Sequence, residues 1–156
     1  MHMHNKLTSL PCVCTTLRKA SRALSRVYDE ALASSGLTVA QLAVLRAIGR
    51  GSNGGEPLSR LAESLVMDRT SLYRALTPMV KSGWLLIQDG PKGRTKVVQL
   101  SKAGTRATAD AAKSWDAAQG KVIGAFGVDR WAALQKAVTE LTALGVKLGG
   151  FEPRVA

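Results

Sequence analysis

The sequence predicts a mainly α-helical fold with one small β-hairpin, and two observations support this prediction. Apolar residues recur at helical spacing through most of the 156-residue chain. The exceptions are two short β-rich runs, 84–89 and 94–100, which flank the turn residues "GPKG". The length suits one domain with extensions, and no stretch reaches the roughly 20 apolar residues of a membrane-spanning helix.

The first two helices are predicted from an apolar stripe and from end signals. Over 13–31 the apolar residues face one side and charged residues the other, and Gly36 ends this segment. Thr38 with Gln41 forms a capping box that opens a helix over 39–48. The run "GSNGGEP" that follows, 51–57, is predicted to be a loop.

A helix-turn-helix is predicted next. "LSRLAESL", 58–65, forms a short helix, and three residues separate it from a helix beginning near Arg69. Asp68 is a plausible N-cap, because its carboxylate can accept a bond from the N–H of Thr70 or Ser71. Helices joined so tightly cross each other. We expect Val66 to adopt this turn without a positive φ.

The helix from Arg69 has an inward and an outward face. The predicted inward residues are Leu72, Ala75, Leu76, Met79 and Val80. The outward residues are polar: Arg69, Thr70, Ser71, Tyr73, Arg74 and Thr77. Pro78 removes one backbone bond, which costs about 3 kcal/mol in a helix interior. The defect falls in the later turns, where it is expected to bend the C-terminal end.

The C-terminal part is predicted to be helical. Ser101 caps a long helix from Lys102 to about 123, "GAFGVD" breaks it, and a last helix spans 129–148. Their apolar stripes are Trp115, Val122, Ile123 and Phe126, then Trp131, Leu134, Val138, Leu141 and Leu144. Since neither end of the chain has a core of its own, we predict a homodimer built from both ends. The alternative is that the two ends pack together within one monomer.

The charge favours an anionic partner. The net charge is +11, with segment charges of +3 for 1–36, +6 for 37–104 and +2 for 105–156. A basic central segment suits nucleic acid or an acidic surface, although charge that only maintains solubility is the alternative. The N-terminus has no hydrophobic segment followed by a small-residue cleavage site, so we expect a cytoplasmic protein.

Three stretches, in this order, resemble the MarR family of winged helix-turn-helix transcriptional regulators. They are "LTVAQLAVLRAI", "LSRLAESLVMDRTSLYRALTPMVKSGWLLIQD" and "GRTKVVQLSKAG", and the match covers 37–104. The resemblance implies a DNA-binding domain over 37–104, an N-terminal dimerisation arm over 1–36 and C-terminal dimerisation helices over 105–156. It also implies a homodimeric, sequence-specific regulator of a pseudo-palindromic operator, most simply a repressor. The alternative is an architectural or nonspecific DNA-binding protein.

The resemblance implies two sets of DNA contacts. The outward residues Arg69, Thr70, Ser71, Tyr73, Arg74 and Thr77 enter the major groove, where arginine can pair with guanine or phosphate. In the hairpin, Arg94 reaches the minor groove, with Lys92 and Lys96 at phosphates. Relatives commonly place an aspartate beside this arginine, but here the neighbour is Gly93, so we expect a less rigid wing.

Regulation is predicted from two groups of residues. Cys12 and Cys14 either pack in the arm or sense oxidants. If both lie on one helix they point in nearly opposite directions, which favours a disulfide between subunits. The family resemblance implies a small aromatic or phenolic effector, for which Tyr28, Arg46 and Trp115 are candidates.

Other functions are disfavoured. A metal site from His2, His4, Cys12 and Cys14 has suitable ligands, but its histidines lie in an N-terminal tail, and we predict no metal and no cofactor. The chain has no Gly-rich phosphate loop, no credible Ser, His and Asp set, and no histidine after residue 4, so we predict that it is not an enzyme.

Overall fold

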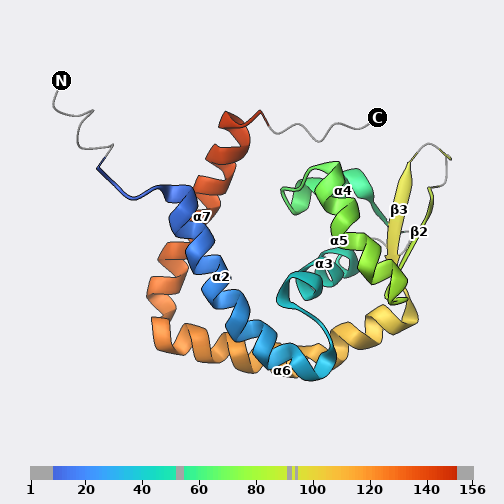
Figure 1. The fold of residues 1–156 in the computed structure, drawn as a ribbon, viewed down its shortest axis with the longest axis horizontal. Helices are drawn as coiled ribbons and strands as arrows, with labels where there is room; N and C mark the ends of the chain where they lie inside the picture. Colours follow the sequence, from blue (N-terminus) through green and yellow to red (C-terminus); the bar gives the residue numbers. More distant parts are fainter. Residues whose placement is uncertain (1–8, 52–54, 91–92, 94, 151–156) are drawn as a thin grey trace.

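A computed structural model describes residues 9–51, 55–90, 93 and 95–150. In chain order the elements are α2 (Val13–Leu32), the 3₁₀ helix η1 (Ala33–Ser35), α3 (Val39–Gly49), β1 (Glu56–Pro57), α4 (Leu58–Ser64), α5 (Arg69–Lys81), β2 (Leu85–Asp89), β3 (Lys96–Leu100), α6 (Lys102–Phe126) and α7 (Val128–Leu148). In Figure 1, α2 and α7 form one side of the molecule, α3–α5 and the sheet form the other, and α6 runs between them. The mainly α-helical fold with a small β wing is confirmed.

The junction of α2 and α3 has the predicted end signals. Gly36 adopts φ 70°, and Thr38 and Gln41 form both bonds of the capping box. The segment Val13–Ser35 and α3 diverge by 74°. Within the described residues no single helix is long and apolar enough to cross a bilayer, although this bent pair passes together on length and composition alone.

The sheet has one more strand than predicted. β2 and β3 form the expected antiparallel hairpin, from Leu85 opposite Leu100 to Asp89 opposite Lys96. β1 pairs with the other edge of β3, so the prediction of a loop over 51–57 is wrong for Glu56 and Pro57. Two residues are too few to show an alternating pattern, and a proline is tolerated here because β1 is an edge strand.

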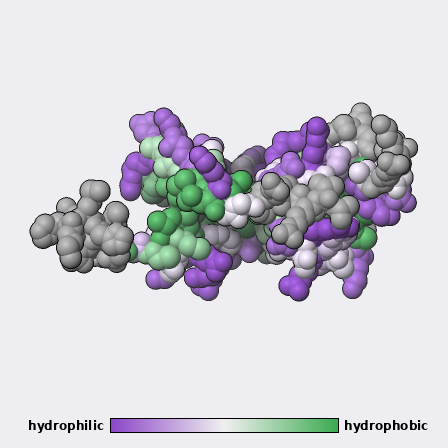
Figure 2. All heavy atoms as spheres, turned by 90° about the horizontal axis from the view of Figure 1, so that it is seen from above, coloured by the Kyte–Doolittle hydropathy of each residue, from purple (hydrophilic) through white to green (hydrophobic). Residues whose placement is uncertain are grey.

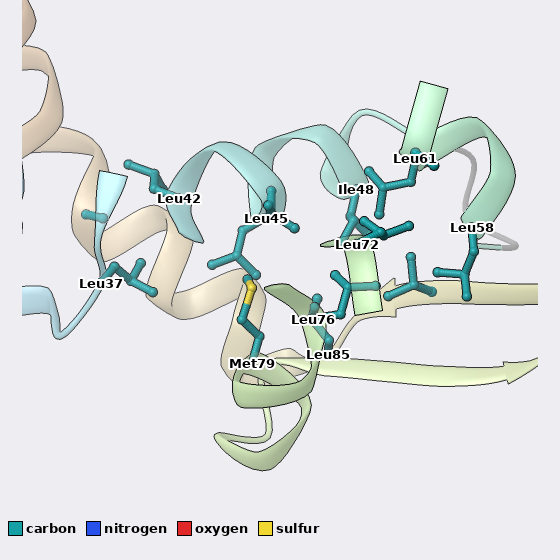
Figure 3. Close-up of a cluster of buried hydrophobic side chains, with 14 of the residues drawn as sticks. Leu37, Leu42, Leu45, Ile48, Leu58, Leu61, Leu72, Leu76, Met79 and Leu85 are labelled. Carbon is teal, nitrogen blue, oxygen red and sulfur yellow. The ribbon is translucent and has the colours of Figure 1, made fainter. Parts of the chain in front are cut away.

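The core lies in the central unit and contains mostly leucine (Figure 3). The largest fully buried side chains are Leu32, Leu42, Leu45, Leu61, Leu72, Leu76, Met79, Leu85 and Val98. From α5, the spacing correctly predicted Leu72, Leu76 and Met79. Val80 was predicted to face inward but is 38% exposed. At 3.6 residues per turn it points about 80° away from Leu72, beyond the edge of the buried stripe.

The break between α6 and α7 is shorter than predicted. α6 continues to Phe126 and α7 begins at Val128, so Gly127 alone separates them, with φ 102°. The expected break from Gly124 is wrong. A glycine inside a helix, such as Gly124, costs only about 1 kcal/mol, which a long helix tolerates.

The start of α6 lies against the first residues of the hairpin. Ser101 caps α6 by accepting the Gly104 N–H at 3.0 Å, and its own N–H donates to the Trp84 carbonyl at 2.9 Å. A Cβ added at Gly104 would overlap this same carbonyl oxygen. Only glycine therefore permits this approach of helix and strand.

We predict opposite effects for two glycine substitutions within α6. Gly104→Ala should lower the free energy of unfolding by about 2–3 kcal/mol, because backbone must move to admit the methyl group. Gly120→Ala is the matched control, because a Cβ there meets nothing within 4 Å. It should raise the free energy of unfolding by about 0.5–1 kcal/mol through helix propensity. Urea unfolding measures both, and equal effects would contradict the close approach at Gly104.

Candidate DNA-binding interface

The turn between α4 and α5 forms a Schellman motif. The Met67 N–H donates to the Ala62 carbonyl at 2.9 Å, and the Val66 N–H donates to the Glu63 carbonyl at 3.1 Å. This motif puts Val66 in the left-handed position usually held by glycine. Its φ is 51°, so the expectation that Val66 avoids a positive φ is wrong. The bonding of the turn imposes this conformation, although a β-branched residue disfavours it.

The first turn of α5 is capped by Asp68, as predicted. Its carboxylate accepts the Ser71 N–H at 2.9 Å and the Ser71 hydroxyl at 2.7 Å. The bond from the Ser71 N–H, and to a smaller extent the bond from its hydroxyl, hold the pKa of Asp68 below its ordinary value. The cap fixes the beginning of the helix and also engages the Ser71 hydroxyl as a donor.

The outward face of α5 is largely the predicted one. Arg69, Thr70, Ser71, Arg74 and Thr77 are exposed. The Thr77 hydroxyl donates to the Tyr73 carbonyl at 2.7 Å, so its proton is already engaged. Arg69, Thr70 and Arg74 are therefore the best available donors on this face.

Tyr73 lies between the outward and the buried face of α5. Tyr73 was predicted to face outward, but its side chain is half-buried and packs against the core. The Arg69 guanidinium carbon lies 5.7 Å from the centroid of this ring, within cation–π range. α5 continues past Pro78 to Lys81, so the proline does not end the helix.

The wing is partly described. Lys92 and Arg94, two of the predicted DNA-binding residues, lie outside the described residues. Lys96 is exposed, and its ammonium lies 2.7 Å from the carboxylate of Asp89 on the facing strand. The hydrogen bond from Lys96 to Asp89, and then the charge of that carboxylate, raise the pKa of Lys96. A phosphate would have to compete with Asp89 for this lysine.

The three residues predicted to line an effector cleft lie close together. The Arg46 guanidinium carbon of α3 lies 4.0 Å from the Trp115 ring centroid of α6. The Tyr28 ring of α2 lies 6.4 Å from the same ring, and its hydroxyl donates to Gln119. Burial raises the pKa of Tyr28. Gln119 was not predicted, because in the sequence it carries no signal beyond its position one turn after Trp115.

The cysteines sit at the beginning of α2, and both are exposed free thiols. Cys12 is the N-cap, with φ −60° and ψ 122°, so it lies outside the helix. Because Cys12 lies outside the helix, the opposite directions of helical side chains two residues apart do not disfavour a disulfide within one chain. Hydrogen bonds from the Thr15 N–H and hydroxyl, and from the Cys14 N–H, lower the pKa of Cys12.

The four residues considered as metal ligands, and predicted not to bind one, are only partly within the described residues. His2 and His4 lie outside the described residues. Among the residues that are described, no group of three histidine, cysteine or acidic side chains could hold a metal ion.

Apolar side chains on the arms are exposed. In the described part of the chain, nine of the twelve exposed large hydrophobic residues lie on α2, just before it, or on α7: Leu10, Val13, Leu17, Leu24, Val27, Val128, Leu134, Leu144 and Leu148. Figure 2 shows a green hydrophobic area at the same end of the molecule as α2 and α7. The arms therefore do not cover these faces within one chain.

The helix-turn-helix and its sheet define a winged-helix protein, and solved structures agree. The M. tuberculosis transcriptional regulator MosR, in complex with DNA, is 30% identical, with a TM-score of 0.80 over 88% of this chain and 98% of MosR. CouR, a transcriptional repressor bound to a 23-mer DNA duplex, is 21% identical, with a TM-score of 0.74 over 88% and 95% of the two chains. E. coli MarR is 19% identical, with a TM-score of 0.64 over 85% and 98% of the two chains.

No protein-family model and no curated protein sequence matches the chain. The identity and coverage shared with MosR nevertheless establish the family, and the less similar structures agree in fold. The chain belongs to the MarR family of transcriptional regulators, which confirms the resemblance seen in the sequence. It is a regulator rather than an enzyme.

Replacing the strained valine should stabilise the protein. Val66→Gly removes a backbone strain of about 1–3 kcal/mol. The greater freedom of glycine in the unfolded chain offsets about 0.5–1 kcal/mol of this, so the free energy of unfolding should rise by about 1 kcal/mol. Val80→Gly is the control, because Val80 has similar exposure but lies inside α5. The control should destabilise by about 1 kcal/mol. Urea unfolding of both variants tests this; a loss of stability in Val66→Gly would contradict the strain.

Proposed function

We propose that this protein is a sequence-specific, double-stranded-DNA-binding transcriptional repressor that acts as a homodimer. The observation that carries the proposal is the division of α5 into two faces. One face is buried through Leu72, Leu76 and Met79, and the other presents exposed Arg69, Thr70 and Arg74. The N-terminal part of such a helix is the part that reads base edges. The DNA complexes of MosR and CouR support the same reading.

The exposed arms support dimerisation. Apolar faces of α2 and α7 that none of the described elements covers would be buried against the same faces of a second copy. We therefore assign residues 1–36 and 105–156 to the dimer and 37–104 to DNA. A twofold dimer requires a pseudo-palindromic site with half-sites about one helical turn, roughly 10 bp, apart.

Arg74→Ala should weaken binding to the operator more than binding to unrelated DNA. If Arg74 pairs with a base, its loss should lower operator affinity about 10–100-fold, against less than about threefold on scrambled DNA. Lys136→Ala is the control, since it removes one exposed positive charge from α7 on the other side of the molecule. Fluorescence anisotropy measures both affinities. Equal losses on both DNAs would make Arg74 a phosphate contact only.

Release from DNA has two candidate triggers. The first is a small aromatic or phenolic anion, for which Arg46 and Trp115 offer a cation and a ring at the junction of α3 and α6. The second is oxidation of Cys12, whose lowered pKa favours the reactive thiolate. A hydroperoxide converts the thiolate to a sulfenic acid, and a second thiol then condenses with it, forming a disulfide and releasing water.

Mild peroxide should abolish operator binding reversibly if the thiols are the trigger. Anisotropy on DNA from upstream of the protein's own gene, before and after peroxide and again after reductant, measures this. Cys12→Ser should be insensitive to peroxide. Cys14→Ser should also be insensitive if Cys14 is the second thiol, and non-reducing electrophoresis separates a bond within a chain from one between subunits. Wild-type binding that is indifferent to peroxide would leave the aromatic ligand as the trigger.

A further inference from the structure

Asp29 makes a contact that the functions above do not use. It lies on α2, in the N-terminal arm, and is half-buried. Its carboxylate accepts the backbone N–H of Val39, the first residue of α3, at 2.6 Å. The bond therefore ties the arm helix to the first helix of the central unit.

The N-terminus of α3 has several caps, of which Asp29 alone comes from another helix. The first N–H groups of a helix have no partner within it. Thr38 accepts the Gln41 N–H at 3.2 Å, and Gln41 accepts the Thr38 N–H at 2.9 Å. These two bonds stabilise α3 locally and place no constraint on α2. The Asp29 bond joins residues ten apart, so it stabilises the beginning of α3 and also constrains α2.

The tie closes a sharp corner. Between the two helices lie only η1, Gly36, Leu37 and Thr38, and the helices diverge by 74°. Leu32 and Leu37 on either side of the corner are both buried. Ser35 adds two short-range bonds, donating to the Leu32 carbonyl at 2.7 Å and accepting the Leu37 N–H at 3.3 Å. Burial fixes the residues of the corner, while the Asp29 bond joins the two helices directly.

The angle at this corner matters for a dimer that binds DNA. α3 has 11 residues. It is therefore about 16 Å long, and a rotation of about 10° at the corner moves its far end by about 3 Å. That displacement is close to the axial rise of roughly 3.4 Å per base along one DNA strand. Because α3 and α5 share one core, α5 would move with α3, and a small change of angle would shift each reading helix by a distance on the order of one base pair relative to the dimer axis.

We infer that Asp29 is a positioning residue that sets the half-site spacing accepted by the dimer, by fixing the angle between the α2 arm and α3. This inference rests on the proposed function as a dimeric DNA-binding regulator. Asp29 touches no DNA in this account. Its removal should broaden spacing preference without removing base recognition.

The test measures affinity for three operators: the natural site, located by footprinting DNA from upstream of the protein's own gene, one with a central base pair inserted and one with a central base pair deleted. The wild-type dimer should prefer one spacing by about tenfold or more. Asp29→Ala should reduce this preference to about threefold or less, or move it to another spacing, while half-site specificity is retained. Thr38→Ala is the matched control, because it removes one cap from the same helix end without cutting the tie to α2.

Asp29→Asn keeps a carbonyl oxygen that can accept the Val39 N–H, so it should behave as wild type. If Asp29→Ala does not fold, Asp29→Ser replaces it, since serine is too short to reach Val39 but remains polar. An unchanged spacing preference in the folded variant that lacks the tie would overturn the inference. If this variant and Thr38→Ala change the spacing preference equally, Asp29 acts only as a helix cap, which would also overturn the inference. A wild-type protein without any spacing preference would instead remove the proposed dimeric function.

Discussion

The orientation of α5 depends on one buried face. Leu72, Leu76 and Met79 lie in the leucine core shared with α3, α4 and the hairpin, so the helix cannot rotate about its axis without exposing them. Fully burying a side chain of this size contributes about 1.5–3 kcal/mol, which makes such a rotation costly. Everything on the opposite face, including Arg69 and Arg74, is placed by this packing. The polar surface is therefore positioned by buried residues that are not part of it.

Three local features fix how the surrounding elements lie: a turn, a close approach and a hydrogen bond. The turn before α5 forces Val66 to a positive φ, whereas the equivalent position after α5 is Gly83, with φ 73°, in the same bonding pattern. Gly104 lets α6 approach the start of the hairpin. Asp29 ties α2 to α3. Together they connect α2, α6, the core and the outward face of α5 through short contacts.

Local signals in the sequence predicted much of this arrangement. The capping box at Thr38, the cap at Asp68 and the spacing of Leu72, Leu76 and Met79 each depend on residues within one or two helical turns. The features that were missed depend on distant partners. The Asp29 bond and the pairing of β1 with β3 leave no periodic trace in the sequence, and the strain at Val66 follows from hydrogen bonds of the turn rather than from its residue type. The DNA contacts of Arg69, Arg74 and Arg94 all stay predictions, and Arg94 also lies outside the described residues.

The central claim is that two copies of α5, related by the twofold axis of an arm-built dimer, read one operator. Hydroxyl-radical footprinting of DNA from upstream of the protein's own gene tests it most directly. The account predicts two protected segments on one face of the duplex, centred about one helical turn, roughly 10 bp, apart and related by a pseudo-palindrome. Uniform protection along the fragment, without a preferred site, would contradict it and favour an architectural DNA-binding protein.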